Sequence, residues 1–584
     1  MKKFRTINLL SFLLAILVLA SCNSIKKMAK NADLIQYSAK PTLLETHAGE
    51  VNFSLDGTIP PKYFVNKAVV TITPTVVYEG GEKALKPIKL QGEKVQQNNK
   101  VVTVKEGGSF TYSEKFEYTD AMRKSELVLK VKAEKGKKSV IFADKKVADG
   151  VIATPTLLVL DPKVLLGSTK KINSTPDSYN PEESVFQRVV PDVLSADIKY
   201  PIQQSDIKGS ELKKENIKAM QALLDEFKTN EKLQLENIEV SSYASPDGAL
   251  DLNTNLSEKR GKSAKSFIDK ELKKKKITDA KVAATTTPED WEGFKALVEQ
   301  SSIQDKQVIL RVLSMYQDVE VREKEIKNMA AAYTDLAGKI LPELRRSKYF
   351  VNLNRIGKSD EEIVELAKNN PSTLNQAELL YAASIVKDND TKLAIYKSFS
   401  TNYPADWRGP NNEGFIYWEK NDFSKAKDAF NRAKGLEANS YVLNNLGAAE
   451  LVTGNMKAAK EYFMASLSAD KKVNYNLALI NVKEGKYNDA VTNMGECKAF
   501  NASLAQLLNG NAAKAKQMLD NKEDKTAMDY YLTAVAAARL GNADQVIGNL
   551  KTALNKDASL SSKAKTDLEF YKFFETPEFK ALIK

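Results

Sequence analysis

The chain of 584 residues is 42% hydrophobic and 28% charged, which is an ordinary globular composition, and its length suggests roughly three or four domains. The 87 basic and 75 acidic residues are spread along the chain, so the net charge of +12 forms no stripe of the kind that binds nucleic acid. One histidine, His47, and two cysteines, Cys22 and Cys497, exclude most catalytic triads and any zinc site built on these residue types. We therefore predict no enzyme, no metal and no cofactor.

The first residues predict an export signal. The stretch "MKKFRTINLLSFLLAILVLASC" has a basic start, an apolar run too short for a permanent membrane helix, and small residues before a cysteine. Its last four residues, Leu19 to Cys22, resemble the lipobox of bacterial lipoproteins. That resemblance implies a signal peptide over 1–21, acylation of Cys22 with palmitate-type chains, and a lipid anchor in the outer membrane. A plain signal peptide with a chance cysteine is the alternative.

Residues 22–166 are predicted to form a tether followed by an all-β sandwich of about seven strands. From about Gln36 to Pro162 the apolar residues alternate with polar ones, and turn residues separate the runs. Val51, Phe53 and Leu55 point to one face of their predicted strand. The region lacks clustered acids and a glycine-rich phosphate loop, so we interpret it as a spacer or interaction module. A stretch rich in Ser, Thr, Asn and Pro then indicates a linker over 167–190.

Residues 191–358 are predicted to form an α/β domain with a helical insertion. Strand, helix, strand, turn, helix and strand follow in order, and the second helix carries Arg260 inside its apolar arc, where a guanidinium needs a partner. This region resembles the OmpA-type peptidoglycan-associating domain, whose pattern N-x-x-L-S-x-x-R is matched by Asn253, Leu256, Ser257 and Arg260. The resemblance implies that Arg260 and an aspartate of the preceding loop clamp the carboxylate and ammonium ends of diaminopimelate in the peptidoglycan stem peptide.

The loop departs from the family pattern at the aspartate. Ser245 stands at the aspartate position, counted from Tyr243, and Asp247 lies two residues further on. Asp247 takes the ammonium role if the loop folds differently around its proline and glycine. About sixty residues then intervene before the predicted closing strand, Arg346 to Leu353. The alternative for Arg260 is a structural bond to a buried acid or to a carbonyl.

Residues 359–584 are predicted to form an all-α solenoid. Gly414 and Phe430 recur as Gly447 and Phe463, each 33 residues later, and further small residues recur after 31. Periods near 34 with small residues at fixed positions are typical of tetratricopeptide repeats. Such an array implies protein partners bound in its concave groove.

These inferences together predict a non-enzymatic outer-membrane lipoprotein that faces the periplasm, links the membrane to peptidoglycan and scaffolds protein partners. Lys26 and Lys27 follow the predicted anchor where acidic residues mark some surface lipoproteins, which favours the inner leaflet over the cell surface. A second hypothesis is a subunit of an assembly or secretion complex, whose OmpA-like domain no longer binds peptidoglycan. The two differ in whether an acid faces Arg260 across an open pocket.

Overall fold

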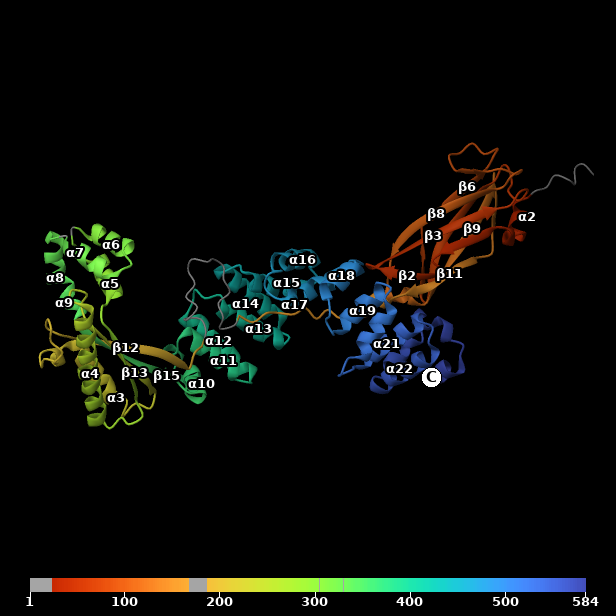
Figure 1. Cartoon of the computed structure of the whole chain (residues 1–584). Coiled ribbons are helices and arrows are strands. Elements are labelled where there is room, and N and C mark those ends of the chain that lie inside the picture. Colours follow the sequence, from red (N-terminus) through yellow and green to blue (C-terminus); the bar gives the residue numbers. More distant parts are fainter. Residues whose placement is uncertain (1–23, 168–185, 304, 329, 584) are drawn as a thin grey trace, which may run out of the picture. The chain divides into compact units, whose positions relative to one another are not determined.

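The computed structural model describes residues 24–167, 186–303, 305–328 and 330–583 (Figure 1). The predicted signal peptide, Cys22 and most of the predicted linker lie outside the described residues. The chain divides into two compact units, of which the first joins Met1–Gly167 to Pro404–Lys584 and the second comprises Ser168–Tyr403. The first unit is therefore discontinuous in sequence, and the second unit is inserted into it.

The N-terminal part of the first unit is a β domain that begins with the short helix α2 (Ile25–Lys30). One part of the sheet has the strand order β11–β9–β4–β6–β7, and another part contains β8, β3 and β1. Strand β2 joins the two parts, because it pairs with β3 and, in parallel, with β11. Val51, Phe53 and Leu55 are buried in one core with apolar residues of β9, so the predicted alternation is confirmed. The strands are β1 (Gln36–Lys40), β2 (Leu43–His47), β3 (Glu50–Ile59), β4 (Val69–Tyr78), β5 (Gly81–Ala84), β6 (Ile88–Gly92), β7 (Lys100–Val102), β8 (Gly108–Glu117), β9 (Ser125–Lys135), β10 (Lys138–Ile141) and β11 (Lys145–Ile152).

The second unit contains a central domain with a four-stranded mixed sheet in the order β12–β15–β13–β14. Apolar residues of α3 and α4, among them Ile217 and Ile268, are buried in one core with Val240 and Val351 of the sheet. The order of elements agrees with the predicted progression. The elements are β12 (Val189–Lys199), α3 (Glu215–Glu226), β13 (Leu233–Tyr243), α4 (Leu250–Lys275), β14 (Lys281–Thr287) and β15 (Arg346–Ile356).

The predicted insertion before β15 is a group of helices with a separate small core around Phe294 and Leu336. They are α5 (Trp291–Gln300), α6 (Lys306–Met315), α7 (Val319–Asn328), α8 (Ala330–Lys339) and α9 (Leu341–Leu344). Helices α10 (Asp360–Asn369), α11 (Gln376–Ile385) and α12 (Asn389–Asn402) also belong to the second unit, so its boundary falls later than residue 358.

Five helix pairs in the first unit form the repeat array. Gly414 and Gly447 permit close pairing, since a Cβ at either position would lie 2.5 or 2.7 Å from the ring of Phe430 or Phe463. The helices are α13 (Arg408–Glu419), α14 (Phe423–Leu436), α15 (Ser440–Val452), α16 (Met456–Ala465), α17 (Lys471–Lys483), α18 (Tyr487–Met494), α19 (Phe500–Leu508), α20 (Ala512–Asp520), α21 (Ala527–Arg539) and α22 (Ala543–Lys556). Further helical turns, α23 (Leu560–Ala564), η6 (Leu568–Phe573) and α24 (Pro577–Leu582), close the end.

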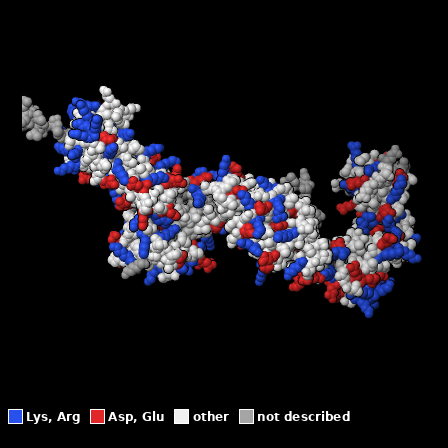
Figure 2. All heavy atoms as spheres, turned by 180° about the vertical axis from the view of Figure 1, so that it is seen from behind, with Lys and Arg blue, Asp and Glu red and all other residues white. Residues whose placement is uncertain are grey.

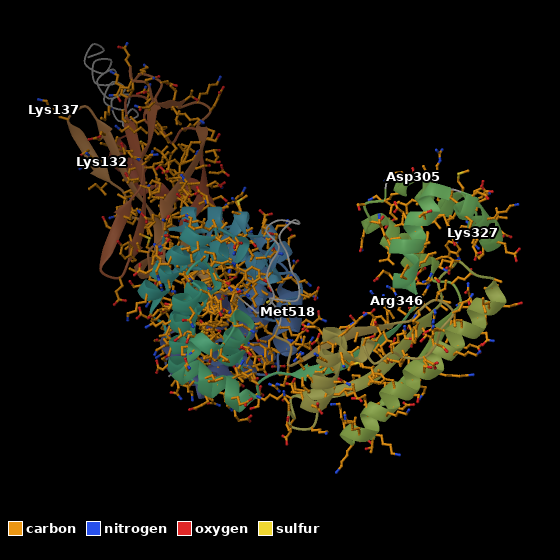
Figure 3. The ribbon with its side chains drawn as sticks, turned by 90° about the vertical axis from the view of Figure 1, so that its left-hand side faces the viewer. Lys132, Lys137, Asp305, Lys327, Arg346 and Met518 are labelled. Atoms are coloured by element: carbon orange, nitrogen blue, oxygen red, sulfur yellow. The ribbon has the colours of Figure 1, made fainter. Side chains whose placement is uncertain are left out.

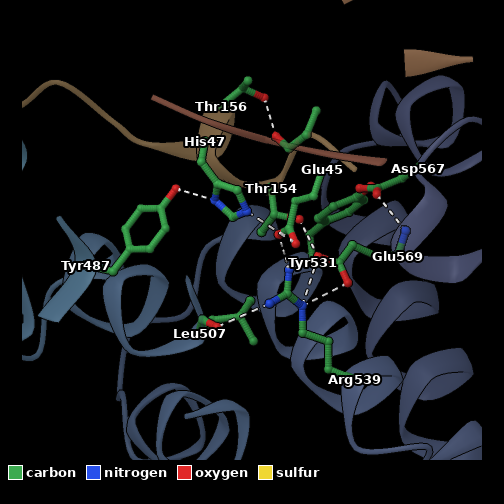
Figure 4. Close-up of polar contacts among 11 residues, drawn as sticks. Glu45, His47, Thr154, Thr156, Tyr487, Leu507, Tyr531, Arg539, Asp567 and Glu569 are labelled. Carbon is green, nitrogen blue, oxygen red and sulfur yellow. Dashed lines mark hydrogen bonds and ion pairs between the residues drawn. The ribbon is translucent and has the colours of Figure 1, made fainter. Parts of the chain in front are cut away.

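Polar contacts attach the β domain to this array (Figure 4). Arg539 of α21 donates to Glu569 at 2.5 Å and to Glu45 of β2 at 3.1 Å, and the hydroxyl of Thr154 donates to Glu569. His47 contributes a ring nitrogen 2.9 Å from the hydroxyl of Tyr487. Burial opposes ionisation of Glu45, yet His47 and Arg539 together hold its pKa below the ordinary value. These side chains bond to one another, and their bonds join the β domain to the array.

Candidate functional site

The predicted peptidoglycan site lies where β13 ends and α4 begins. Helix α4 places Arg260 toward the sheet, where its side chain is fully buried. Its guanidinium donates to the carbonyl oxygens of Tyr243 at 2.9 Å, Gln204 at 3.0 Å and Pro201 at 3.4 Å. Burial, with the nearby charge of Arg345, lowers the pKa of Arg260 to about 10, so the group stays cationic at neutral pH. Its donors are directed at the protein's own backbone.

The loop acid Asp247 is paired within the domain. Arg345, the residue before β15, donates to the Asp247 carboxylate at 3.2 Å and to the hydroxyl of Ser245 at 3.2 Å. Ser245 in turn donates to Asp247 at 2.5 Å. The side chains of Arg345 and Asp247 are only 12% and 16% exposed. The structure thus brings Ser245 and Asp247 together, and it adds Arg345, a residue that the sequence analysis did not single out.

Asn253 takes part in a neighbouring contact rather than in this pair. Its amide donates to the carbonyl of Gly248 at 2.9 Å and to Glu289 at 3.3 Å, and Glu289 also accepts from the indole of Trp291 at 3.0 Å. Asn253 therefore stabilises the loop ahead of α4. A ligand with a carboxylate and an ammonium group would have to compete with carbonyls at Arg260 and with Arg345 at Asp247.

A second candidate site is the groove of the repeat array, which contains a segment of the same chain. Residues 159–167, here called the strap, follow η3 (Thr154–Leu157) and run along α13, α15, α17 and α19 as the orange trace in Figure 1. The sequence analysis assigned residues up to 166 to the β sandwich. The structure ends the last strand at Ile152 and places the strap against the array.

Four asparagines hold the strap by its backbone, and we call them the asparagine ladder. Each side-chain amide accepts from the N–H and donates to the C=O of one strap residue. Asn412 pairs in this way with Gly167 (2.8 and 2.8 Å) and Asn445 with Leu165 (2.6 and 2.7 Å). Asn476 pairs with Lys163 (2.6 and 2.7 Å), and Asn501 pairs with Val159 (3.0 and 2.7 Å).

The spacing of these contacts explains the extended form of the strap. Residues 163, 165 and 167 are two apart, so their N–H and C=O groups lie on one edge of an extended chain. All four ladder side chains are buried. A buried peptide group without a partner costs about 1 to 3 kcal/mol, and here the ladder pairs both groups of each contacted residue. The carbonyls of Leu165 and Lys163 also accept a second bond, from Asn411 at 3.2 Å and Asn444 at 3.0 Å. The ladder contacts are to the backbone, while the strap also buries Val164 and Leu165, and its Asp161 carboxylate accepts from Asn501 and Tyr475.

The ladder was detectable in the sequence. Each of its asparagines stands two residues before the small residue at the helix-pairing position, which is Gly414, Gly447, Ala478 or Ser503. The sequence analysis aligned Gly414 with Gly447 without assigning a role to the asparagines that precede them, and it did not align Ser503. Asparagine inside a helix is an unfavourable choice for helix formation, so its recurrence at one repeat position is the signal that was missed.

Among the residues that the structure describes, no group of three or more His, Cys, Asp or Glu side chains is arranged to hold a metal ion. Within the same ranges, no helix is both long enough and apolar enough to cross a membrane.

Comparison with known proteins identifies the repeats. The family model described as "Tetratricopeptide repeat" matches residues 411–440 and 441–473. No curated protein matches the chain. Similar solved structures include PilW, a type IV pilus biogenesis factor, with 16% identity over 38% of this chain and 98% of that chain, at a TM-score of 0.26. A tetratricopeptide repeat protein from Parabacteroides merdae has 14% identity over 42% of this chain and 98% of that chain, at a TM-score of 0.27.

A third similar structure, YrrB, is titled a TPR protein with an unusual peptide-binding site and has 17% identity over 35% of this chain and 99% of that chain, at a TM-score of 0.22. The matched residues span α13 to α16 and the start of α17, so they include the helices that carry Asn412 and Asn445. The C-terminal part of this chain contains tetratricopeptide repeats.

Proposed function

We propose that the protein is a non-enzymatic scaffold that is anchored to the outer membrane through Cys22 and recruits protein partners with its tetratricopeptide repeats. The observation that carries the proposal is the asparagine ladder, since Asn412, Asn445, Asn476 and Asn501 all bind peptide backbone. A surface that grips a chain by its backbone suits protein contact. In this arrangement the strap occupies the ladder, and partners contact the outer surface of the array or displace the strap.

Exposed apolar side chains on the array indicate where a partner would contact it. Met464 on α16 and Leu467 just after it are 58% and 47% exposed. We expect a photo-crosslinking amino acid at Met464 to capture a protein in cells, while the same amino acid at the exposed Lys514 of α20 serves as the control. Mass spectrometry then identifies the captured protein. Absence of adducts at every exposed apolar position of the array would contradict the scaffold proposal.

The anchor has its own test. The proposal rests on the residues Leu19 to Cys22, and Cys22→Ala should release the protein from outer membranes into the soluble periplasmic fraction. The measurement is fractionation after a high-salt wash. A Cys22→Ala protein that still pellets with outer membranes would show that lipid does not hold it. Protection of the wild-type protein from external protease would support the periplasmic side over the cell surface.

Peptidoglycan attachment is a second candidate function, favoured by the match of Asn253, Leu256, Ser257 and Arg260 to the OmpA-like pattern. The internal pairing of Asp247 with Arg345, together with the carbonyls around Arg260, instead supports an assembly subunit whose OmpA-like domain does not bind peptidoglycan. The test is co-sedimentation of the wild-type protein with purified sacculi. We expect no co-sedimentation. Binding that disappears in Asp247→Asn would restore the peptidoglycan proposal.

A further inference from the structure

The end of the β domain nearest the chain start carries a group of exposed lysines. Helix α2 packs against the hairpin of β9 and β10, and its Ile25 and Met28 enter the domain core. We call the exposed lysines of α2 and of this hairpin the basic surface. It consists of Lys26, Lys27, Lys30, Lys135, Lys137 and Lys138. Figure 2 shows blue side chains gathered at this end of the domain, and Figure 3 shows Lys137 projecting from it.

Among the described residues, the two acids next to this surface, Glu134 and Asp33, are paired with other lysines. Glu134 is paired with Lys132 at 2.7 Å, and Asp33 is paired with Lys145 at 3.5 Å, and neither of these lysines belongs to the basic surface. Lys135 and Lys138 are also direct partners across the antiparallel hairpin. Like charges placed opposite each other destabilise a sheet. An anion that lies over both lysines would offset that cost.

The position of the surface indicates which anion it meets. Strands β3 and β9 cross the domain, and the turn between β2 and β3 at one end contacts the repeat array through His47 and Tyr487. The basic surface lies at the other end, about 35 Å away for strands of this length. Lys26 is only four residues after Cys22, so a lipid on Cys22 would hold this end at the membrane.

We propose that the basic surface binds the phosphate headgroups of anionic phospholipids. The inference rests on the proposed lipid anchor for its orientation. The lysines bind as point charges, so the attraction requires no specific lipid and weakens as salt screens it. The surface would hold the β domain end-on to the membrane, with the repeat array directed away from the bilayer.

Vesicle binding by the unacylated protein tests this separately from the anchor. The full mature chain with Cys22→Ser is sedimented with phosphatidylcholine vesicles that contain either no phosphatidylglycerol or about one third of it. We expect binding to the anionic vesicles alone, lost at high salt. The triple variant K135E/K137E/K138E should lower the binding constant about 10- to 100-fold.

A matched triple variant controls for general charge. K270E/K273E/K274E changes the net charge equally on the exposed side of α4 and should leave binding unchanged. K135Q/K138Q should weaken binding while the melting temperature stays the same or rises, because it removes the opposed charges. The proposal is overturned if the wild-type surface does not bind, or if both triple variants lose binding alike. Unacylated Cys22 in the native protein, seen by mass spectrometry, would instead remove the anchor and leave vesicle binding intact.

Discussion

Arg260 and the carbonyls of Tyr243, Gln204 and Pro201 are here called the Arg260 cluster. The asparagine ladder and the Arg260 cluster both use buried side chains to bind backbone from elsewhere in the chain, but the side chains differ in charge and in hydrogen-bonding groups. A ladder asparagine is neutral and contains both a donor and an acceptor, so it satisfies the N–H and C=O of one strap residue. Arg260 is a cation with donors only, and it collects three carbonyl oxygens. The ladder therefore pairs both backbone groups of each residue that it contacts, whereas the arginine fixes one specific arrangement of loops around itself.

This difference bears on which site can exchange its occupant. Another extended segment could replace the strap and form the same bonds with Asn445 and Asn476, because the contacts are to backbone atoms. Displacement of the carbonyls would leave the fully buried guanidinium of Arg260 without acceptors. We therefore interpret the ladder as a site of recognition and the Arg260 cluster as part of the framework of the central domain.

The largest effect is expected at Arg260. Arg260→Ala removes a fully buried side chain and the donors of three partly buried carbonyls, and it leaves a cavity, which should destabilise the second unit by about 3 to 5 kcal/mol and lower its melting temperature by roughly 10 °C. Thermal unfolding followed by circular dichroism measures this, with Lys259→Ala on the exposed face of α4 as the control. An unchanged melting temperature would show that Arg260 is available for a ligand.

The ladder should give a smaller loss that is confined to the strap. N445A/N476A leaves the N–H groups of Leu165 and Lys163 unpaired, while their C=O groups keep bonds from Asn411 and Asn444. We expect a loss of about 2 to 4 kcal/mol for docking of the strap. Hydrogen exchange at residues 163–167 should accelerate by about two orders of magnitude, while the helices keep their protection. Asn488→Ala, an exposed asparagine on α18, is the control. Unchanged exchange would mean that other contacts hold the strap.

The sequence predicted elements well where periodicity was strong. The alternation of Val51, Phe53 and Leu55 and the 33-residue repeat both correspond to the structure, because these patterns follow from which side chains a sheet or helix pair must bury. The occupant of the groove was not predictable in this way. Residues 159–167 carry no pattern that distinguishes a strap from a strand end, and their partners lie about 245 to 342 residues away.

For Arg260 the sequence predicted the need for a partner but not which residues supply it. The position of Arg260 on the apolar face of α4 required a partner, and carbonyls were one of the alternatives. The identity of these carbonyls depends on the turn at Pro201 to Gln204. The pairing of Arg345 with Asp247 depends on where the helical insertion ends. Both are long-range outcomes of packing that no local spacing encodes.

A third test compares these sites with the contact between the β domain and the array. His47 and Arg539 lower the pKa of Glu45, so its contribution is present above the ordinary value of 4.5 and is lost as the pH falls through the lower folded value. Glu45→Gln should remove about 1 kcal/mol or less at neutral pH and flatten that part of the acid decline. Denaturant unfolding across this pH range measures it. Parallel stability curves for the two proteins would contradict the pairing.

The smallest effect on the stability of the first unit is expected from removal of the whole second unit, which contains the Arg260 cluster. A Cβ on Gly167 would lie 3.1 Å from the side chains of Trp407 and Arg408, so the chain leaves the first unit and returns to it at nearly the same place. Replacement of residues 168–403 by a linker of about eight glycine and serine residues, which reaches roughly 27 Å, should therefore close the gap without strain.

The shortened chain tests whether the ladder is independent of the inserted unit. Asn412 holds Gly167 next to the join, so the β domain and the array should unfold at the same denaturant concentration as they do in the full chain. Introducing N445A/N476A into the shortened chain should then cost the same as in the full protein, because the inserted unit has its own core and does not supply the ladder. A lower midpoint for the shortened chain alone would show that the two units stabilise each other.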